Sequence, residues 1–172
     1  MTDTSATPDA NTSPLPPQLR IMAQYVKDLS FENPGAPEAF RGGQAPGIDL
    51  SIDVQARTMG ENMFEVMLNI NARATRENDE VVFIAELAYG GLFQLANIAD
   101  MDREPFLLIE CPRLLFPFAR RVLADATRDG GFPPLMLDPV DFAGLYRQQM
   151  VKRAAAVPGQ DTNGNGDPAA SN

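Results

Sequence analysis

The hydrophobic pattern of the chain predicts four β-strands. Residues 48–57 and 63–75 alternate apolar and polar side chains with the two-residue period of a strand that has one solvated face. Residues 19–32 follow the same period less strictly, because Lys27 falls on the apolar side. Residues 80–93 are apolar on both faces apart from Glu86, which is typical of an inner strand.

The alternation within residues 19–32 separates two kinds of side chain. One face is predicted to carry the apolar residues Leu19, Ile21, Ala23, Tyr25, Leu29 and Phe31. The opposite face is predicted to carry polar residues, among them Asp28, Ser30 and Glu32.

The connections between these segments predict the order of the strands. The polar residues 77–80 form a hairpin turn between the third and fourth strands. Residues 33–47 are rich in proline and glycine and are too long for a hairpin, so the first strand is free to lie beside the fourth. With the strands numbered in chain order, the predicted spatial order is 2-3-4-1, a Greek-key arrangement.

Two helices are predicted after the sheet. Residues 106–128 have helical spacing but contain Pro112 and Pro117, which predicts a bent or two-part helix. A second helix is predicted to start with Asp138 as N-cap and Pro139 in the first helical position. The fold class is therefore α+β, a four-stranded antiparallel sheet followed by two C-terminal helices, the first of them kinked.

The two ends of the chain differ from its middle. Residues 1–18 and 158–172 are rich in small polar residues, glycine and proline, which predicts two disordered tails. Residues 19–157 between them predict one domain of common size.

Composition limits the chemistry of the protein. The chain has 172 residues, a formal net charge of -9, one cysteine and no histidine. It therefore has no histidine-based triad, no imidazole metal ligand and no CxxC pair, and no phosphate-binding glycine motif occurs. The negative charge disfavours nucleic acid and anionic membranes and favours a basic protein partner. We expect function by binding, without catalysis, cofactor or metal, and the single cysteine fits a reducing cytoplasm.

Two acidic groups allow a second interpretation. Asp49, Ser51 and Asp53 share one strand face, which is either solvated or a site for a hard cation, and a solvated face is the default. The carboxylates at residues 100–104 form either a polar linker or a pair for acid–base catalysis. An enzyme would need a substrate pocket, and a small-ligand module would need a closed cavity between the sheet and the helices.

Five segments in sequence order resemble the SecB family of protein-export chaperones. They are YVKDLSFENPGAP (25–37), FEVMLNINARA (64–74), FIAELAYGGLF (83–93), CPRLLFPFAR (111–120) and GFPPLMLDPVDFAGLY (131–146). The resemblance implies the same α+β fold, assembled as a homotetramer that is a dimer of dimers. It also implies a cytoplasmic chaperone that binds unfolded precursor proteins without ATP and delivers them to the SecA motor for export across the inner membrane. The alternative is a SecB-like chaperone that controls a toxin–antitoxin system.

The resemblance implies a SecA-binding site at Asp28, Glu32, Ile84 and Glu86. The residues themselves support it, because these side chains project from one face if the first and fourth strands are neighbours. An apolar patch rimmed by negative charge has the anatomy of a protein contact, although a solvated acidic face is the default.

The resemblance also implies a groove for extended, apolar client segments, formed by the second helix and the long loop. On that basis Phe40, Phe142, Leu145 and Tyr146 are the candidate client-binding residues. Spacing alone assigns the last three to the core, so both roles stay open.

An oligomer interface is predicted on the fourth strand. Its face made of Phe83, Ala85, Leu87 and Tyr89 presents more apolar surface than two helices of one subunit are expected to cover.

Overall fold

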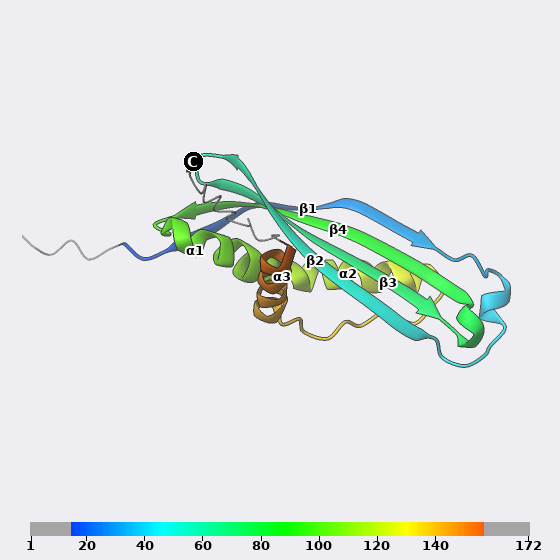
Figure 1. The fold of residues 1–172 in the computed structure, drawn as a ribbon. Helices are drawn as coiled ribbons and strands as arrows, with labels where there is room; N and C mark the ends of the chain where they lie inside the picture. Colours follow the sequence, from blue (N-terminus) through cyan, green and yellow to red (C-terminus); the bar gives the residue numbers. More distant parts are fainter. Residues whose placement is uncertain (1–14, 157–172) are drawn as a thin grey trace, which may run out of the picture.

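The computed structural model describes residues 15–156 and contains one antiparallel sheet with helices on one face (Figure 1). The strands are β1 (Gln18–Glu32), β2 (Gly47–Gly60), β3 (Met63–Thr75) and β4 (Val81–Ala96). Residues 1–14 and 157–172 lie outside the described residues, and they include most of the predicted tail 1–18 and all of the predicted tail 158–172. Within residues 15–156, no helix has the length and apolar character needed to cross a membrane.

The sheet has the predicted topology. Its strands lie in the order β1-β4-β3-β2, which is the predicted order 2-3-4-1 counted from the other edge. The long connection after β1 crosses to the far edge, so β4 is an inner strand with hydrogen-bonded neighbours on both sides. The apolar character of both faces of β4 is therefore explained by its position.

Strand β1 departs from simple alternation. Its pairing with β4 shifts between Ile21 and Ala23 and again between Val26 and Asp28. Each extra residue inverts which face the following side chains occupy. Ala23 and Tyr25 therefore lie on the face away from the helices, and the prediction that they share a face with Leu19 and Phe31 was wrong.

The first helical region starts earlier than predicted. It comprises α1 (Asp100–Pro105), a π-helical segment (Phe106–Glu110) and α2 (Cys111–Asp129). The carboxylates at residues 100–104 thus belong to a helix and not to a linker. The predicted irregularity exists, but it follows Pro105, which has no N–H to donate to the preceding turn. Helix α2 continues through Pro117, where a kink was expected.

The last helix, α3 (Phe142–Ala156), starts later than predicted. The side chain of Asp141 accepts a hydrogen bond of 2.9 Å from the backbone N–H of Gly144, the geometry of an N-terminal cap. Asp138 and Pro139 lie in the connection before the helix, so their assignment to its start was wrong.

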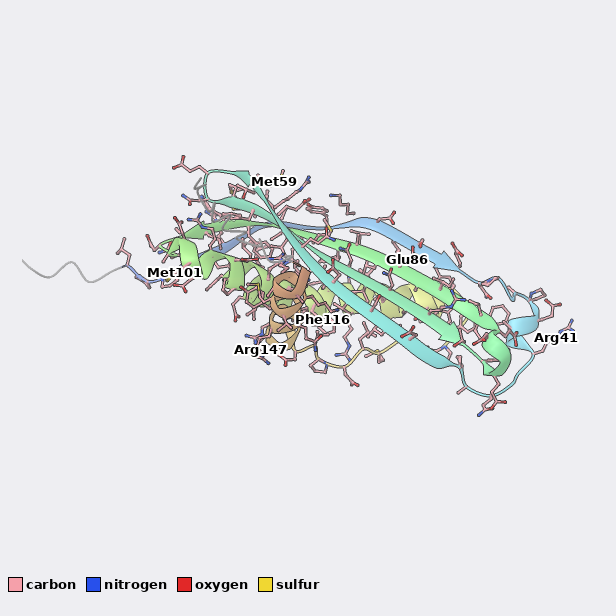
Figure 2. All side chains as sticks on the ribbon, viewed as in Figure 1. Arg41, Met59, Glu86, Met101, Phe116 and Arg147 are labelled. Carbon is pink, nitrogen blue, oxygen red and sulfur yellow. The ribbon has the colours of Figure 1, made fainter. Side chains whose placement is uncertain are left out.

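The core lies between the sheet and α2 and includes Leu68, Ile70, Leu87, Leu115 and Leu123. Figure 2 shows Phe116 on the helix side of the sheet and Glu86 on the opposite side. We call the side without helices the outer face. Two short 3-10 turns, Glu38–Phe40 and Glu77–Asp79, complete the described elements.

Candidate binding surfaces

The four residues predicted to bind SecA lie together on the outer face. In the β1–β4 pairing, Glu32 is opposite Ile84, Ser30 is opposite Glu86, and Asp28 is opposite Ala88. Paired residues in an antiparallel sheet project from the same face. Asp28, Glu32 and Glu86 are exposed, and Ile84 is partly buried between them. We call these four residues the acidic surface.

The carboxylates of the acidic surface have no cationic partner within the described chain. Among residues 15–156, none of the ten ion pairs includes Asp28, Glu32 or Glu86. Like charges on neighbouring strands are mildly destabilising. The surface is therefore available to a basic partner, whose cations would relieve this repulsion.

Another carboxylate on the same face, Glu65, is held in a cluster of hydrogen bonds and charges. Glu65 in β3 is only 6% exposed and accepts hydrogen bonds from the hydroxyl of Tyr25 and from Nε of Arg57. The Lys27 ammonium lies 3.6 Å from it. The pKa of Glu65 is lowered mainly by the hydrogen bond from Arg57 and next by the hydrogen bond from Tyr25. The pKa of Tyr25 is raised to about 12, mainly by burial and next by its hydrogen bond to Glu65.

The position of Tyr25 depends on a glycine in β4. A Cβ atom at Gly90 would lie 2.6 Å from Cε2 of Tyr25 and 3.1 Å from Cε of Met67. The missing side chain lets the tyrosine ring cross β4 and reach Glu65. This cluster joins β1, β3 and β2 across the sheet. Alternation placed Glu65 on the solvated face, and only the register shifts in β1 bring Tyr25 to it.

Phe40 is the outermost ring of an aromatic stack. Its side chain is 50% exposed, and its ring centroid lies 5.3 Å from that of Phe132. Phe132 lies 5.1 Å from Phe83, which lies 5.6 Å from Phe31. The loop between β1 and β2 therefore presents an aromatic surface that is supported from beneath.

The same loop is anchored by Arg76, which the sequence interpretation missed. Its Nη2 donates a hydrogen bond of 3.0 Å to the carbonyl of Ala39, and Nη1 lies 3.7 Å from Glu80. Gly43 packs against the guanidinium, where an added Cβ would lie 3.4 Å from Cζ. Arg76 thus fixes the residue next to Phe40. A local sequence pattern gives no signal for a contact between residues so far apart.

The predicted client residues of α3 divide into core and surface. Phe142 is 1% exposed and packs edge-on against Phe116 with ring centroids 5.9 Å apart. Phe142 therefore belongs to the core, and its side chain is not accessible to clients in this conformation. Leu145 and Tyr146 are partly buried and line a cavity of about 120 Å³ together with Ile52 of β2.

Strand β2 adds exposed apolar surface on the helix side of the sheet. Ile48 and Leu50 alternate with the polar face and point to the helix side, yet they are 41% and 40% exposed. β2 is an edge strand, so side chains near its start have no strand on one side. From the loop of Phe40, this apolar row leads along β2 to Ile52 and Tyr146. Asp49, Ser51 and Asp53, on the other face of β2, are exposed, and no group of metal-ligating side chains occurs among the described residues.

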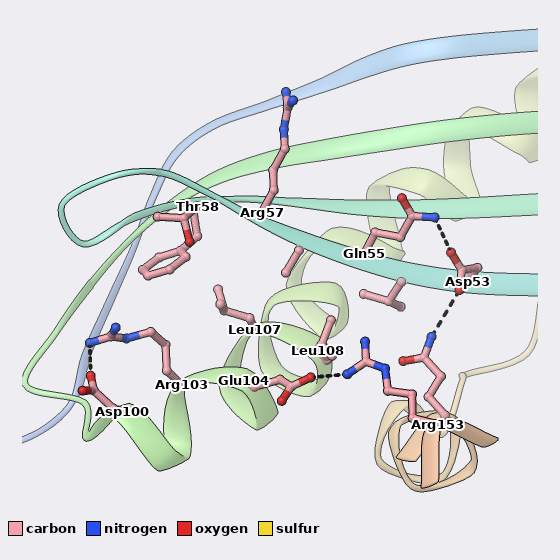
Figure 3. Close-up of a pocket in the computed structure, with 14 residues that line it drawn as sticks. Asp53, Gln55, Arg57, Thr58, Asp100, Arg103, Glu104, Leu107, Leu108 and Arg153 are labelled. Carbon is pink, nitrogen blue, oxygen red and sulfur yellow. Dashed lines mark hydrogen bonds and ion pairs between the residues drawn. The ribbon is translucent and has the colours of Figure 1, made fainter. Parts of the chain in front are cut away.

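A hollow of about 680 Å³ separates β2 from α1 and α3 (Figure 3). Polar contacts surround it: Arg153 lies 2.6 Å from Glu104, and Gln149 donates a hydrogen bond of 3.2 Å to Asp53. These contacts hold the end of α3 to α1 and β2. The walls are mainly polar side chains, so this hollow differs from the apolar cavity that a small-ligand module predicts.

The predicted oligomer face is already covered within one chain. Phe83, Ala85, Leu87 and Tyr89 are between 0% and 8% exposed and belong to the core under the helix layer. This removes the reason for which a second subunit was expected there. Exposed apolar side chains lie instead along the β1 edge and α2, and we call them the apolar band: Ile21, Val26, Leu29, Leu114 and Phe118. Beside the band, Leu19 and Leu114 line a hollow of about 1020 Å³.

Comparisons with known proteins agree on one family. A family model described as SecB, preprotein translocase subunit SecB, matches residues 12–153. The chain is 73% identical to a "Protein-export protein SecB" of Maricaulis maris over 173 residues, which covers 100% of both chains. A protein of the same name from Afipia carboxidovorans is 55% identical over 155 residues, 90% of this chain and 94% of that one.

Among solved structures, the Mycobacterium tuberculosis Rv1957 SecB-like chaperone, in complex with a ChAD peptide from the Rv1956 HigA1 antitoxin, has a similar fold. The TM-score is 0.60 at 17% identity, with 71% of this chain and 90% of that chain covered.

Proposed function

The chain belongs to the SecB family of protein-export chaperones, and we propose that it holds unfolded precursor proteins without ATP in the cytoplasm and delivers them to SecA. It does this by binding and not by catalysis. The full-length identity to proteins named for export favours this role over toxin control, since the SecB-like chaperone of M. tuberculosis is similar in fold alone.

The observation that carries the SecA proposal is the acidic surface. Glu32 and Glu86 lie beside Ile84, Asp28 lies further along β1, and none of these three exposed carboxylates takes part in an ion pair within the described chain. A basic segment with an apolar side chain complements this pattern, with the apolar contact at the centre and the charges at the rim. Such a contact forms quickly and weakens with added salt.

Calorimetry with a zinc-loaded, basic tail peptide of SecA tests this surface. Glu86→Lys should weaken binding about tenfold or more, because it removes one attraction and adds a repulsion. Ile84→Ala should weaken binding with little change in salt dependence, because it removes only apolar contact. Glu61→Lys, in the exposed turn between β2 and β3 and far from the surface, makes the same change of charge and is the matched control. Equal affinities of wild type and Glu86→Lys contradict the proposal.

We propose the client surface as the apolar row from Phe40 along β2 to Tyr146. Its support is the exposure of Phe40, Ile48 and Leu50, beside a free strand edge. Extended, apolar segments of unfolded chains match such a row, and aromatic rings give large contact area at low entropic cost. A folded protein hides these segments, which explains selectivity for unfolded chains.

Leu50→Asp tests the client surface against a control on the same strand. Met59 is also exposed on β2, at 52%, but lies at the distant hairpin end. Leu50→Asp should weaken binding of a reduced, unfolded protein about tenfold, because it places a charge in the apolar row, whereas Met59→Asp should leave it nearly unchanged. Equal losses for both variants contradict the proposed row.

We propose that the apolar band mediates assembly into a homotetramer, a dimer of dimers. Five large apolar side chains exposed along one edge exceed what a monomer needs on its surface. Light scattering coupled to gel filtration should give about four times the chain mass for wild type. Phe118→Glu should lower it, and Met101→Glu, at a position 83% exposed outside the band, should not. An unchanged mass for Phe118→Glu contradicts the proposal.

A further inference from the structure

One cation lies directly beside the acidic surface. Arg73 in β3 is opposite Ile84 of β4 and also opposite Asp49 of β2. Because Glu32 is opposite Ile84 on the other side, one row across the outer face reads Glu32, Ile84, Arg73, Asp49. Arg73 is exposed, so its guanidinium adjoins any segment that covers Ile84.

Arg73 has carboxylates near it but is bonded to none of them. Within residues 15–156 it takes part in no ion pair or side-chain hydrogen bond, whereas Arg57, Arg76 and Arg103 each pair with a carboxylate. A guanidinium presents a planar fork of donors that fits a carboxylate with two parallel bonds. Arginine is also enriched among the residues that dominate interface energies. The fork of Arg73 is thus open to a ligand on the outer face.

We propose that Arg73 makes the acidic surface selective for a segment of mixed charge. Cationic side chains lie over Glu32 and Glu86, an apolar side chain lies on Ile84, and a carboxylate of the partner lies on Arg73. A uniformly basic segment brings a cation against Arg73 and is disfavoured. This inference rests on the proposed docking function and adds the order of charges that the partner must have.

The row also sets the spacing of those charges. Neighbouring strands are about 4.8 Å apart, so Glu32 and Arg73, two strands apart, are separated by about 10 Å. An extended segment that crosses the strands advances about 3.3 Å per residue. Because alternate side chains of such a segment point to the same side, its cation, apolar residue and carboxylate should occupy positions i, i+2 and i+4. Their span of about 13 Å fits the row within the reach of long side chains.

Three synthetic peptides test the order of charges. One carries lysine, an apolar residue and glutamate in this spacing, the second has glutamine for that glutamate, and the third has lysine there. Calorimetry with the full chain should show that wild type prefers the glutamate peptide over the glutamine peptide by about two- to fivefold, the range of an exposed ion pair. The lysine peptide should bind more weakly than the glutamine peptide.

Arg73→Gln should abolish the preference for glutamate over glutamine and improve binding of the lysine peptide about two- to fivefold. Asp49→Asn should keep the preference, whereas loss of the preference in that variant would mean that Arg73 acts through Asp49. An equal preference in wild type and Arg73→Gln overturns the inference while leaving the docking surface intact. Binding of all three peptides that is insensitive to Glu86→Lys, or no binding to wild type, overturns the docking function and this inference with it.

Discussion

Glu65 and Glu86 lie on the same face of one sheet, yet their surroundings differ completely. Glu65 is buried under Tyr25 and Arg57, which donate hydrogen bonds to it. Glu86 is exposed and has no ion pair within the described chain. The same functional group therefore stabilises the fold at one place and is free for a partner at the other. The two carboxylates differ in burial and in hydrogen bonding. Neither the residue type nor the alternation along the strand reveals this difference.

The largest expected effect comes from removing the space in which Tyr25 reaches Glu65. Gly90→Ala places a methyl group 2.6 Å from the tyrosine ring, so the ring must leave or the strands must separate. Overpacking of this kind costs about 1–3 kcal/mol of unfolding free energy, measured by urea denaturation. Gly60→Ala is the matched control, because nothing lies within 4 Å of its added Cβ. Equal stability of Gly90→Ala and wild type would show that Tyr25 adapts freely.

Exchanging each carboxylate for its amide tests the comparison directly. Glu65→Gln should lower the unfolding free energy by about 1–2 kcal/mol, because the hydrogen bonds to Arg57 and Tyr25 lose their charge. Glu86→Gln should leave stability within about 0.5 kcal/mol of wild type. Urea denaturation of both variants under one condition gives the two values. Similar losses for both would remove the distinction between them.

At acidic pH, Glu65 should lose its contribution to the unfolding free energy. Its pKa is lowered in the folded protein, so its contribution is present above the ordinary glutamate pKa of about 4.3 and is lost as pH falls through the lower folded value. The stability difference between wild type and Glu65→Gln should therefore shrink below about pH 4. Urea denaturation over this range measures it. A difference that does not change with pH would assign the loss to packing.

At alkaline pH, ionisation of Tyr25 should lower the stability of the folded protein by a smaller amount. Its pKa is raised to about 12, so the protonated hydroxyl is favoured in the folded protein. The contribution is present below the ordinary tyrosine pKa of about 10 and is lost as pH rises from there through the folded value. Tyr25→Phe should flatten this part of the profile. Ultraviolet absorbance of the tyrosinate, compared between wild type and Tyr25→Phe, follows the titration; a midpoint near about 10 for Tyr25 contradicts the cluster.

The features of the fold that depend on local sequence patterns could be predicted. Strand order, the inner position of β4 and the joint placement of Asp28, Glu32, Ile84 and Glu86 follow from alternation and loop length, and the structure agrees. Alternation failed in β1, because two bulges invert the faces and bring Tyr25 to the outer side.

Contacts between distant segments could not be predicted in the same way. Phe142 has the spacing of a surface stripe and of a core residue alike, and only its packing on Phe116 decides between them. The burial of Phe83 and Leu87 depends on how far the helix layer extends over the sheet. A local sequence pattern does not predict this extent. The anchoring of the loop by Arg76 is likewise a contact between residues 37 positions apart.

The π-helical segment determines which changes in length the chain can accept. In this turn the backbone N–H of Cys111 bonds to the carbonyl of Phe106, one residue further back than in an α-helix. Deleting one residue there gives a regular α-helical turn with almost the same total rotation, because a π-helical turn holds about one residue more than an α-helical turn. Leu115 and Leu123 then keep facing the sheet. The same deletion at Arg113, within the regular turns of α2, rotates the rest of the helix by about 100° and turns both leucines away from the sheet. A single-residue deletion that is harmless in residues 106–110 would thus expose the core when it falls a few residues later.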